Sequence, residues 1–256
     1  GLIQVDDHVS RQYELTSFVA FLAASAGLWL ALILKWRWQQ FSFFPWLLLL
    51  PLCLYFWPTV FDSHFSADYG FISWPLALAL LYGIFYQQEQ AGLSLFKPIA
   101  LHSISYLLIV SVVSYELAWL VDDFGWLIAW SAVAAMSVLI LALHLINRSL
   151  AWPFTHFSQA YQLIAALVII ALMLIWSLVF NFISVLKPAP IPYLPVLNPI
   201  DLIQLLGLWT ITRWYHLYGH KRVESVQVDP RWVLALLSGF VFIWLNVLLL
   251  KTIHLV

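Results

Sequence analysis

The stretch LIAALVIIALMLIWSLVF, from Leu163 to Phe180, decides the fold because every residue in it except Ser177 is apolar. A helix of about 20 apolar residues crosses a bilayer and satisfies its own backbone hydrogen bonds there. The rest of the chain has the same character. Of its 256 residues 64% are hydrophobic and 9% are charged, against roughly 25% charged residues in soluble domains. The composition therefore predicts an integral membrane protein and excludes a water-soluble or a disordered chain.

Further apolar runs predict an all-α, polytopic transmembrane helical bundle that forms a single domain over residues 1–256. No run shows the alternation of polar and apolar residues that is typical of a membrane β-strand. We expect eight spans, at residues 15–34, 43–60, 71–86, 98–120, 125–147, 159–186, 200–218 and 231–250.

The basic residues predict the orientation of these spans. Alternate loops on one face collect eight Lys and Arg residues, and the other face has three, which are Arg11, Lys187 and Lys251. Because basic loops stay in the cytoplasm, the face with eight is expected to be cytoplasmic. Both termini are then periplasmic, and the chain is expected to be a multi-pass protein of the bacterial inner membrane.

The composition also excludes several kinds of partner and cofactor. The 11 basic and 12 acidic residues form no basic stripe that would bind nucleic acid. The one cysteine, Cys53, excludes a disulfide framework, and no motif of a phosphate loop, a serine hydrolase or a zinc protease is present. We expect no cofactor and no metal. The chain begins at Gly1 with no initiator Met, which we interpret as a processed product or an internal piece of a longer protein.

Polar side chains on several spans are expected at a similar depth near the periplasmic surface. An ionisable group inside the bilayer costs about 2.5–3.5 kcal/mol on insertion scales, so such groups are functional candidates. We predict a water-accessible pocket for a lipid or small molecule, lined by Glu116, Asn181, Asp201, Asn246, Lys251 and His254. The structural alternative is that the asparagines hydrogen-bond between helices and that Glu116 pairs with a lysine.

A proline-rich segment adds two candidates, Tyr193 and Asn198, to this pocket. Its sequence is Pro192-Tyr193-Leu194-Pro195-Val196-Leu197-Asn198-Pro199-Ile200-Asp201. Its prolines favour a stiff, extended loop. Asn198 is expected to cap a helix that begins at Pro199, with Asp201 in its first turn near the positive end of the helix dipole. This explains Asn198 and Asp201 without a ligand. The functional alternative is a lid over the pocket, with Tyr193 and Asp201 facing a substrate.

One helical stripe carries His102, Ser105, Tyr106 and Glu116 and is expected to face protein, with a proton path along it as the alternative. No pair of histidines has the spacing of a metal or haem site within one helix. We therefore expect His102 and His144 to make ordinary polar contacts. The acidic residues of the outer loops are expected to form a solvated rim, with a divalent cation as the alternative.

The run PYLPVLNPIDLIQLLGLW, from Pro192 to Trp209, resembles the proline-rich signature of a family of bacterial predicted membrane proteins, Domain of Unknown Function 2339. Two further stretches are similar to that family: one from Trp152-Pro153 to Trp176 and Asn181, the other joining Trp244-Leu245-Asn246 to Lys251-Thr252-Ile253-His254. The resemblance covers roughly residues 98–256, and Lys251 stands where the family usually has Arg. It implies a much longer polytopic protein, whose further helices would be partners of this chain. The family has no assigned activity, so the resemblance implies no catalytic residues.

Three hypotheses of function follow. The first is an inner-membrane protein whose outward-facing polar pocket binds or transports an envelope-related small molecule or lipid. The second is a membrane-embedded transferase for a lipid-linked substrate, with Asp201, Glu116 or His254 as general base. The third is a structural or assembly subunit with no ligand. The sequence leaves open whether the protein is an enzyme.

Overall fold

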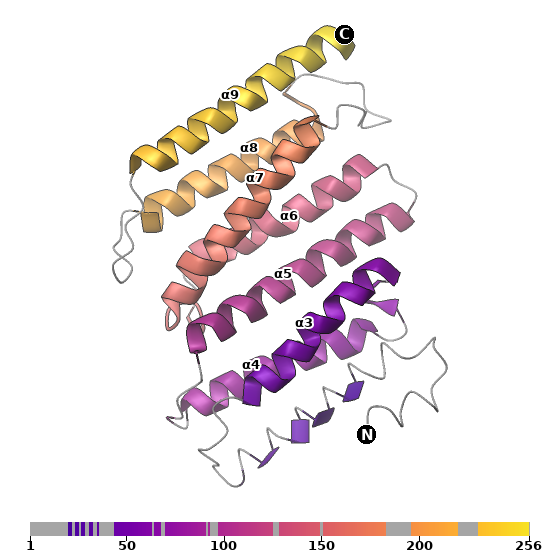
Figure 1. The fold of residues 1–256 in the computed structure, drawn as a ribbon, viewed down its shortest axis with the longest axis vertical. Coiled ribbons are helices and arrows are strands. Elements are labelled where there is room, and N and C mark those ends of the chain that lie inside the picture. Colours follow the sequence, from indigo (N-terminus) through magenta and orange to yellow (C-terminus); the bar gives the residue numbers. More distant parts are fainter. Residues whose placement is uncertain are drawn as a thin grey trace. The chain divides into compact units, whose positions relative to one another are not determined.

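The structure is a computed structural model, and every regular element that it describes is a helix (Figure 1). It describes residues 44–62, 64–67, 70–90, 92, 97–124, 128–148, 151–182, 196–219 and 230–255, together with isolated positions between 20 and 35. The elements are α3 (Phe44–Asp62), α4 (Gly70–Gln90), α5 (Pro98–Asp123), α6 (Ile128–Asn147), the π-helix η4 (Gln159–Ala165), α7 (Ala166–Phe182), α8 (Pro199–Trp214), the π-helix η5 (Tyr215–Gly219) and α9 (Pro230–Leu255).

Four helical stretches within the described residues are long and apolar enough to cross a membrane. They are Gly70–Gln90, Pro98–Asp123, Trp130–Asn147 and Gln159–Asn181. The shorter apolar stretches Phe44–Trp57 and Leu237–Leu250 lie in α3 and α9, within the predicted spans 43–60 and 231–250. The predicted span 200–218 corresponds to α8 continued by η5, and most of the predicted span 15–34 lies outside the described residues. The prediction of an all-helical membrane protein is confirmed.

The chain divides into two compact units, Gly1–Val112 and Val113–Val256. In the first unit α3 and α4 form a helical hairpin, whose connection contains Phe65. This ring stacks on Phe56 with a centroid separation of 5.3 Å and meets Trp74 edge-on at 5.1 Å. A Cβ atom on Gly70 would collide with the backbone carbonyl of Phe65, so only glycine allows α4 to start this close to the preceding turn.

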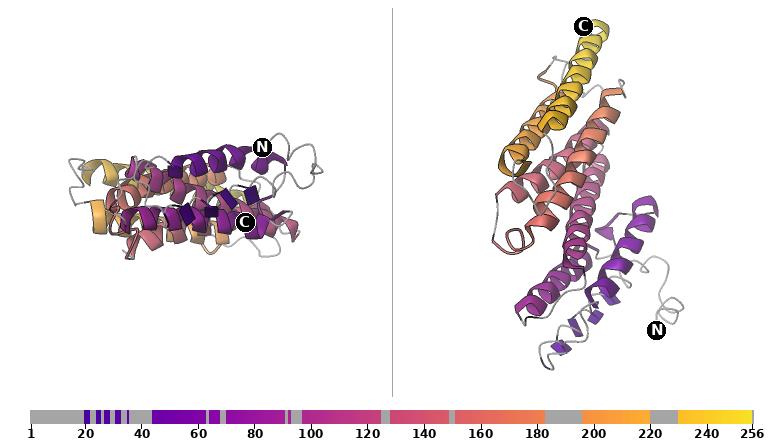
Figure 2. Two further views of the ribbon diagram at one scale, coloured as in Figure 1. Left: turned by 90° about the horizontal axis from the view of Figure 1, so that it is seen from below. Right: turned by 60° about the vertical axis from the view of Figure 1, so that its left-hand side comes forward.

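In the second unit α6, α7 and α8 pack against one another, as the views in Figures 1 and 2 show, and Gly207 of α8 lies at their contact. A Cβ atom on Gly207 would lie 2.8 Å from Cε of Met136 in α6 and 3.2 Å from Cε of Met173 in α7. Ile140 of α6 lies beside Gly207 of α8, and Ile146 at the end of α6 is bonded to Tyr218 after the end of α8. Helices α6 and α8 therefore run in the same direction. Helix α7 runs in the opposite direction. Gln162, just before α7, is bonded to Trp214 at the end of α8, and Asn181 near the end of α7 is bonded to Gln204 near the start of α8.

Both described π-helices lie at one end of this three-helix core. The Trp214 Nε1–H, at the last residue of α8, donates a hydrogen bond of 2.8 Å to the carbonyl of Gln162 in η4. The Tyr218 hydroxyl in η5 donates to the carbonyl of Ile146, at 3.2 Å. The last four carbonyls of an α-helix have no partner within the helix, and Ile146 is in that last turn of α6. The π-helical segments thus hold the ends of α6 and α8 together.

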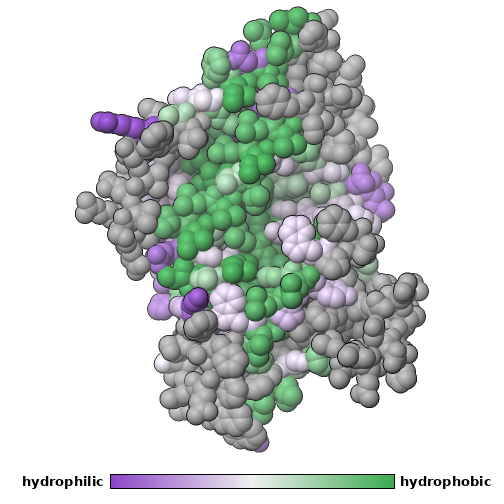
Figure 3. Space-filling view, in the orientation of Figure 1, coloured by the Kyte–Doolittle hydropathy of each residue, from purple (hydrophilic) through white to green (hydrophobic). Residues whose placement is uncertain are grey.

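The outer surfaces of these helices are apolar. In α7 the exposed side chains include Leu167, Leu172, Ile175 and Val179, and in α9 they include Phe242, Leu245, Leu249 and Ile253. On the face drawn in Figure 3, hydrophobic residues cover the middle of the second unit's helices. Exposed apolar surface on this scale is typical of a protein that contacts lipid.

Replacing Gly207 with Leu is expected to destabilise the second unit. The added side chain would enter the space that the two methionines fill, and overpacking of this kind costs about 1–3 kcal/mol. The free energy of unfolding in detergent, followed by helical circular dichroism, measures the change. Gly239→Leu in α9 is the matched control because no described atom lies within 4 Å of its Cβ position. There we expect a gain of up to about 1 kcal/mol from helix propensity alone. Equal stability of the two variants would contradict the close packing around Gly207.

Candidate functional site

The first turn of α8 has the capping structure that the sequence predicts. Asn198 is extended, with φ −66° and ψ 138°, and its side-chain oxygen accepts a hydrogen bond of 2.9 Å from the amide of Ile200. The helix begins at Pro199, which has no N–H to satisfy, and the Asn198 carbonyl accepts from Leu202 at 2.9 Å. The prediction of Asn198 as the N-cap is confirmed.

Asp201 and Gln204 follow on one face of α8, three residues apart, and both are buried. The Gln204 Nε2 donates a hydrogen bond of 3.1 Å to the side-chain oxygen of Asn181, which lies near the end of α7. Asn181, Asp201 and Gln204 are each 2% exposed or less. They form a polar cluster, called here the α7–α8 cluster, at the end of the second unit where α7 finishes and α8 starts.

The amide pair of this cluster is incompletely satisfied by the described residues. Among them, neither Nδ2 of Asn181 nor Oε1 of Gln204 has a hydrogen-bond partner. If both amides were turned over, the bond between them would reverse its direction, and one donor and one acceptor would still remain. Leaving a buried polar group without a partner costs about 1–3 kcal/mol, so the pair favours a further polar group beside it.

The other predicted pocket residues are distributed more widely. Glu116 is half-buried on α5, and Asn246 is exposed on α9, where its amide donates to the Phe242 carbonyl of the same helix at 2.7 Å. Lys251 and His254 belong to α9, but their side chains lie outside the described residues, as does the whole of Tyr193. The structure thus brings Asn181 and Asp201 into one buried region with Asn198 at its edge. The rest of the predicted pocket stays a prediction.

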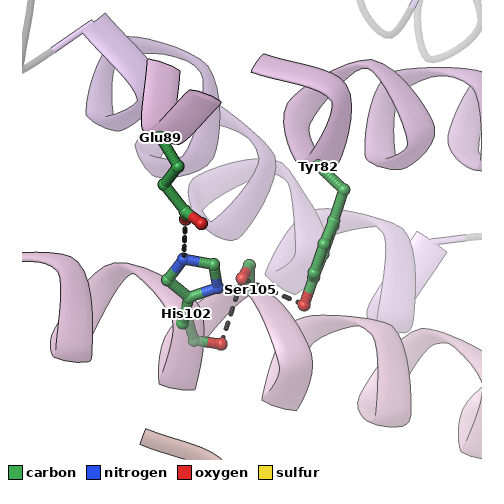
Figure 4. Close-up of polar contacts among 4 residues, drawn as sticks. All are labelled: Tyr82, Glu89, His102 and Ser105. Atoms are coloured by element: carbon green, nitrogen blue, oxygen red, sulfur yellow. Dashed lines mark hydrogen bonds and ion pairs between the residues drawn. The ribbon is translucent and has the colours of Figure 1, made fainter. Parts of the chain in front are cut away.

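A second polar cluster lies in the first unit, between α4 and α5 (Figure 4). The Nε2 of His102 is 3.3 Å from Oε1 of Glu89, and the His102 side chain is fully buried. One turn along α5, the Ser105 hydroxyl donates to the His102 carbonyl at 3.1 Å and is hydrogen-bonded to the Tyr82 hydroxyl at 3.3 Å. Three residues of the predicted stripe of α5, His102, Ser105 and Tyr106, are buried and face protein, whereas the fourth, Glu116, is half-buried.

Two partners in these clusters, Glu89 and Gln204, were missing from the sequence analysis. Glu89 is one residue from the end of α4 and His102 is in the first turns of α5, so a helical hairpin places the two side by side. Gln204 lies one turn after Asp201 on the same face. Helical spacing and the short connection therefore contained the signal for both partners.

The described residues include no group of three or more His, Cys, Asp or Glu side chains that could hold a metal ion. The α7–α8 cluster itself presents two amides beside one carboxyl group, which form hydrogen bonds. Such a set can bind a group that both donates and accepts hydrogen bonds, such as a hydroxyl.

Truncating the amide pair is expected to reveal a direct interaction between α7 and α8. A double-mutant cycle of Asn181→Ala and Gln204→Ala, measured as free energy of unfolding in detergent, should give a coupling of about 0.6 kcal/mol and at most about 1.7. Asn246→Ala paired with Gln204→Ala is the matched control and should give no coupling, because Asn246 is exposed and bonded within its own helix. A coupling of zero for the first pair would contradict the hydrogen bond.

Comparison with known proteins identifies the family. The family model described as "Predicted membrane protein (DUF2339)" matches residues 8–255, which is nearly the entire chain and extends well beyond the region of the motif resemblance. No curated protein and no solved structure matches the chain. The chain belongs to the DUF2339 family of predicted membrane proteins.

Proposed function

We propose that the chain is a multi-pass inner-membrane protein that binds or transports an envelope-related small molecule or lipid at the α7–α8 cluster. The proposal includes the eight-span arrangement with both termini in the periplasm, which puts the end of α7 and the start of α8 near the periplasmic surface. The observation that carries it is the buried amide pair of Asn181 and Gln204, from which one donor and one acceptor remain without a partner among the described residues.

The remaining donor and acceptor specify the kind of group that fits. A hydroxyl can accept from the asparagine amide and donate to the glutamine oxygen at the same time. Sugars and glycerol-based lipid headgroups carry such hydroxyls. Asp201, buried one turn before Gln204, adds a carboxyl oxygen that accepts a second hydroxyl.

The hydrogen bond between Asn181 and Gln204 also supports a second candidate function. Amide bonds across helices stabilise membrane bundles without any ligand, and a structural or assembly subunit needs nothing more. The two functions differ in what happens when both amides are replaced together. Apolar side chains of similar size fill the same space and need no hydrogen bonds. If the pair is purely structural, replacing both amides in this way should change the free energy of unfolding little.

The test is the double variant Asn181→Leu with Gln204→Leu. We expect it to accumulate in the membrane at the wild-type level and to lose ligand binding. The probes are phosphatidylglycerol, phosphatidylethanolamine and a polyprenyl phosphate, each added to purified protein in mild detergent, with the unfolding temperature and native mass spectra as readouts. Binding at 100 times the dissociation constant stabilises a protein by about 2.7 kcal/mol, which is a readily measured shift.

Thr212→Leu is the matched control, since Thr212 is half-buried on the same helix and its hydroxyl bonds to the Leu208 carbonyl. It should respond to the probes like the wild type. Stabilisation of wild type by one probe and its loss in the double variant would support the binding function. An equal response of wild type and double variant, or no response of wild type to any probe, would reject binding at this cluster in favour of the structural function.

A further inference from the structure

The Glu89–His102 pair of the first unit places two ionisable groups against each other inside the helical hairpin. Figure 4 shows the carboxylate of Glu89 directed from α4 onto the imidazole of His102 on α5. The 3.3 Å separation of Oε1 and Nε2 is a hydrogen bond, and an ion pair when the imidazole is protonated. Placing an ionisable side chain inside a membrane helix costs free energy. Such residues usually pair with another ionisable group, and they commonly mark functional sites.

The imidazole of His102 is buried against two aromatic rings. The His102 side chain is 0% exposed, and its ring lies 4.7 Å from the ring of Phe85 and 6.3 Å from that of Tyr82, measured between centroids. The Glu89 side chain is 14% exposed, so the carboxylate is the member of the pair that reaches the surface. A proton can therefore arrive from water at Glu89 and pass to His102 along the bond that joins them.

We propose that Glu89 and His102 together form a proton-binding site, which exchanges its proton with water through Glu89. Without the proton the pair is a carboxylate beside a neutral imidazole and carries one negative charge. With it the pair is either imidazolium beside carboxylate or imidazole beside carboxylic acid, and both forms have no net charge. Because a low-dielectric environment penalises net charge, proton binding and the packing of this hairpin are linked.

The other ionisable groups around this hairpin belong to three elements. On α4 and the first half of α5 they are Tyr82, bonded to Ser105, the exposed Tyr86 and the buried Tyr106, and Lys97 precedes α5 at the same end of the hairpin. The remaining ones on α5 lie toward its other end and are Tyr115, Glu116, Asp122 and Asp123. The described titratable side chains of α3, which packs on α4, are Cys53 and Tyr55. Thiols, phenols and ammonium groups ordinarily change charge well above neutral pH, so Glu89 and His102 are the carboxylate and the imidazole at this end of the hairpin that can exchange a proton near or below it.

The site is tested by following the His102 ring by NMR, in protein labelled at histidine and glutamate and held in detergent micelles, from about pH 4 to pH 10. His102→Gln assigns the signal. We expect the His102 ring to take up one proton, and Glu89→Gln to weaken its proton affinity about tenfold or more, since an opposite charge at this distance has effects of that size. The exposed His156 and His216 serve as internal controls, and their signals should be the same in both proteins at every pH.

A second measurement in the wild type alone keeps the inference testable if Glu89→Gln fails to fold. Interacting groups titrate as a pair, so the carboxyl carbon of Glu89 should report a step at the same pH as the His102 ring. A His102 ring that stays in one protonation state throughout, an unchanged affinity in Glu89→Gln, or separate steps for the two groups would overturn the proposal. These outcomes concern the first unit only and are independent of ligand binding at the α7–α8 cluster.

Discussion

A polar group buried between membrane helices has only the protein itself, or something the protein binds, to hydrogen-bond with. This constraint explains why the described chain is helical, since helices satisfy the backbone internally. It also explains the two polar clusters. Gln204 bonds to Asn181 across α7 and α8, and His102 bonds to Glu89 across α4 and α5. In each case a side chain from one helix satisfies a side chain from another.

Much of the fold follows from local sequence. Long apolar runs predict α4, α5, α6 and α7, and the pattern of asparagine, proline and aspartate at the start of α8 predicts its N-cap residue and its first helical residue. Apolar length alone does not separate a spanning helix from a shorter one, however. Helix α8 has 16 residues and is continued by a π-helix. In α3 and α9 the apolar stretches that the structure describes are shorter than a membrane span. The predicted count of eight spans therefore goes beyond the four that the described helices support by length and composition.

The candidate site could be predicted only in part, because depth along a helix says nothing about the direction of a side chain around it. Asn181 and Asp201 are buried, as a protein-facing position requires, whereas Asn246 at a similar predicted depth is exposed. The stripe of His102, Ser105 and Tyr106 was predictable because helical periodicity defines a face. Predicting its partner Glu89 also requires knowing that α4 and α5 are joined by a short connection. That connection brings Glu89 and His102 together although they are 13 residues apart in the sequence.

The π-helix η4 has a consequence for the evolution of this chain. A π-helical turn accommodates one residue more than an α-helical turn, and η4 forms the start of the helix that α7 continues. Deleting one residue there would restore α-helical winding and rotate all of α7 by about 100° relative to the segment before it. Asn181 would then leave Gln204 and face another direction. A change of one residue in the length of η4 would thus redirect the whole surface of α7 in a single mutational step.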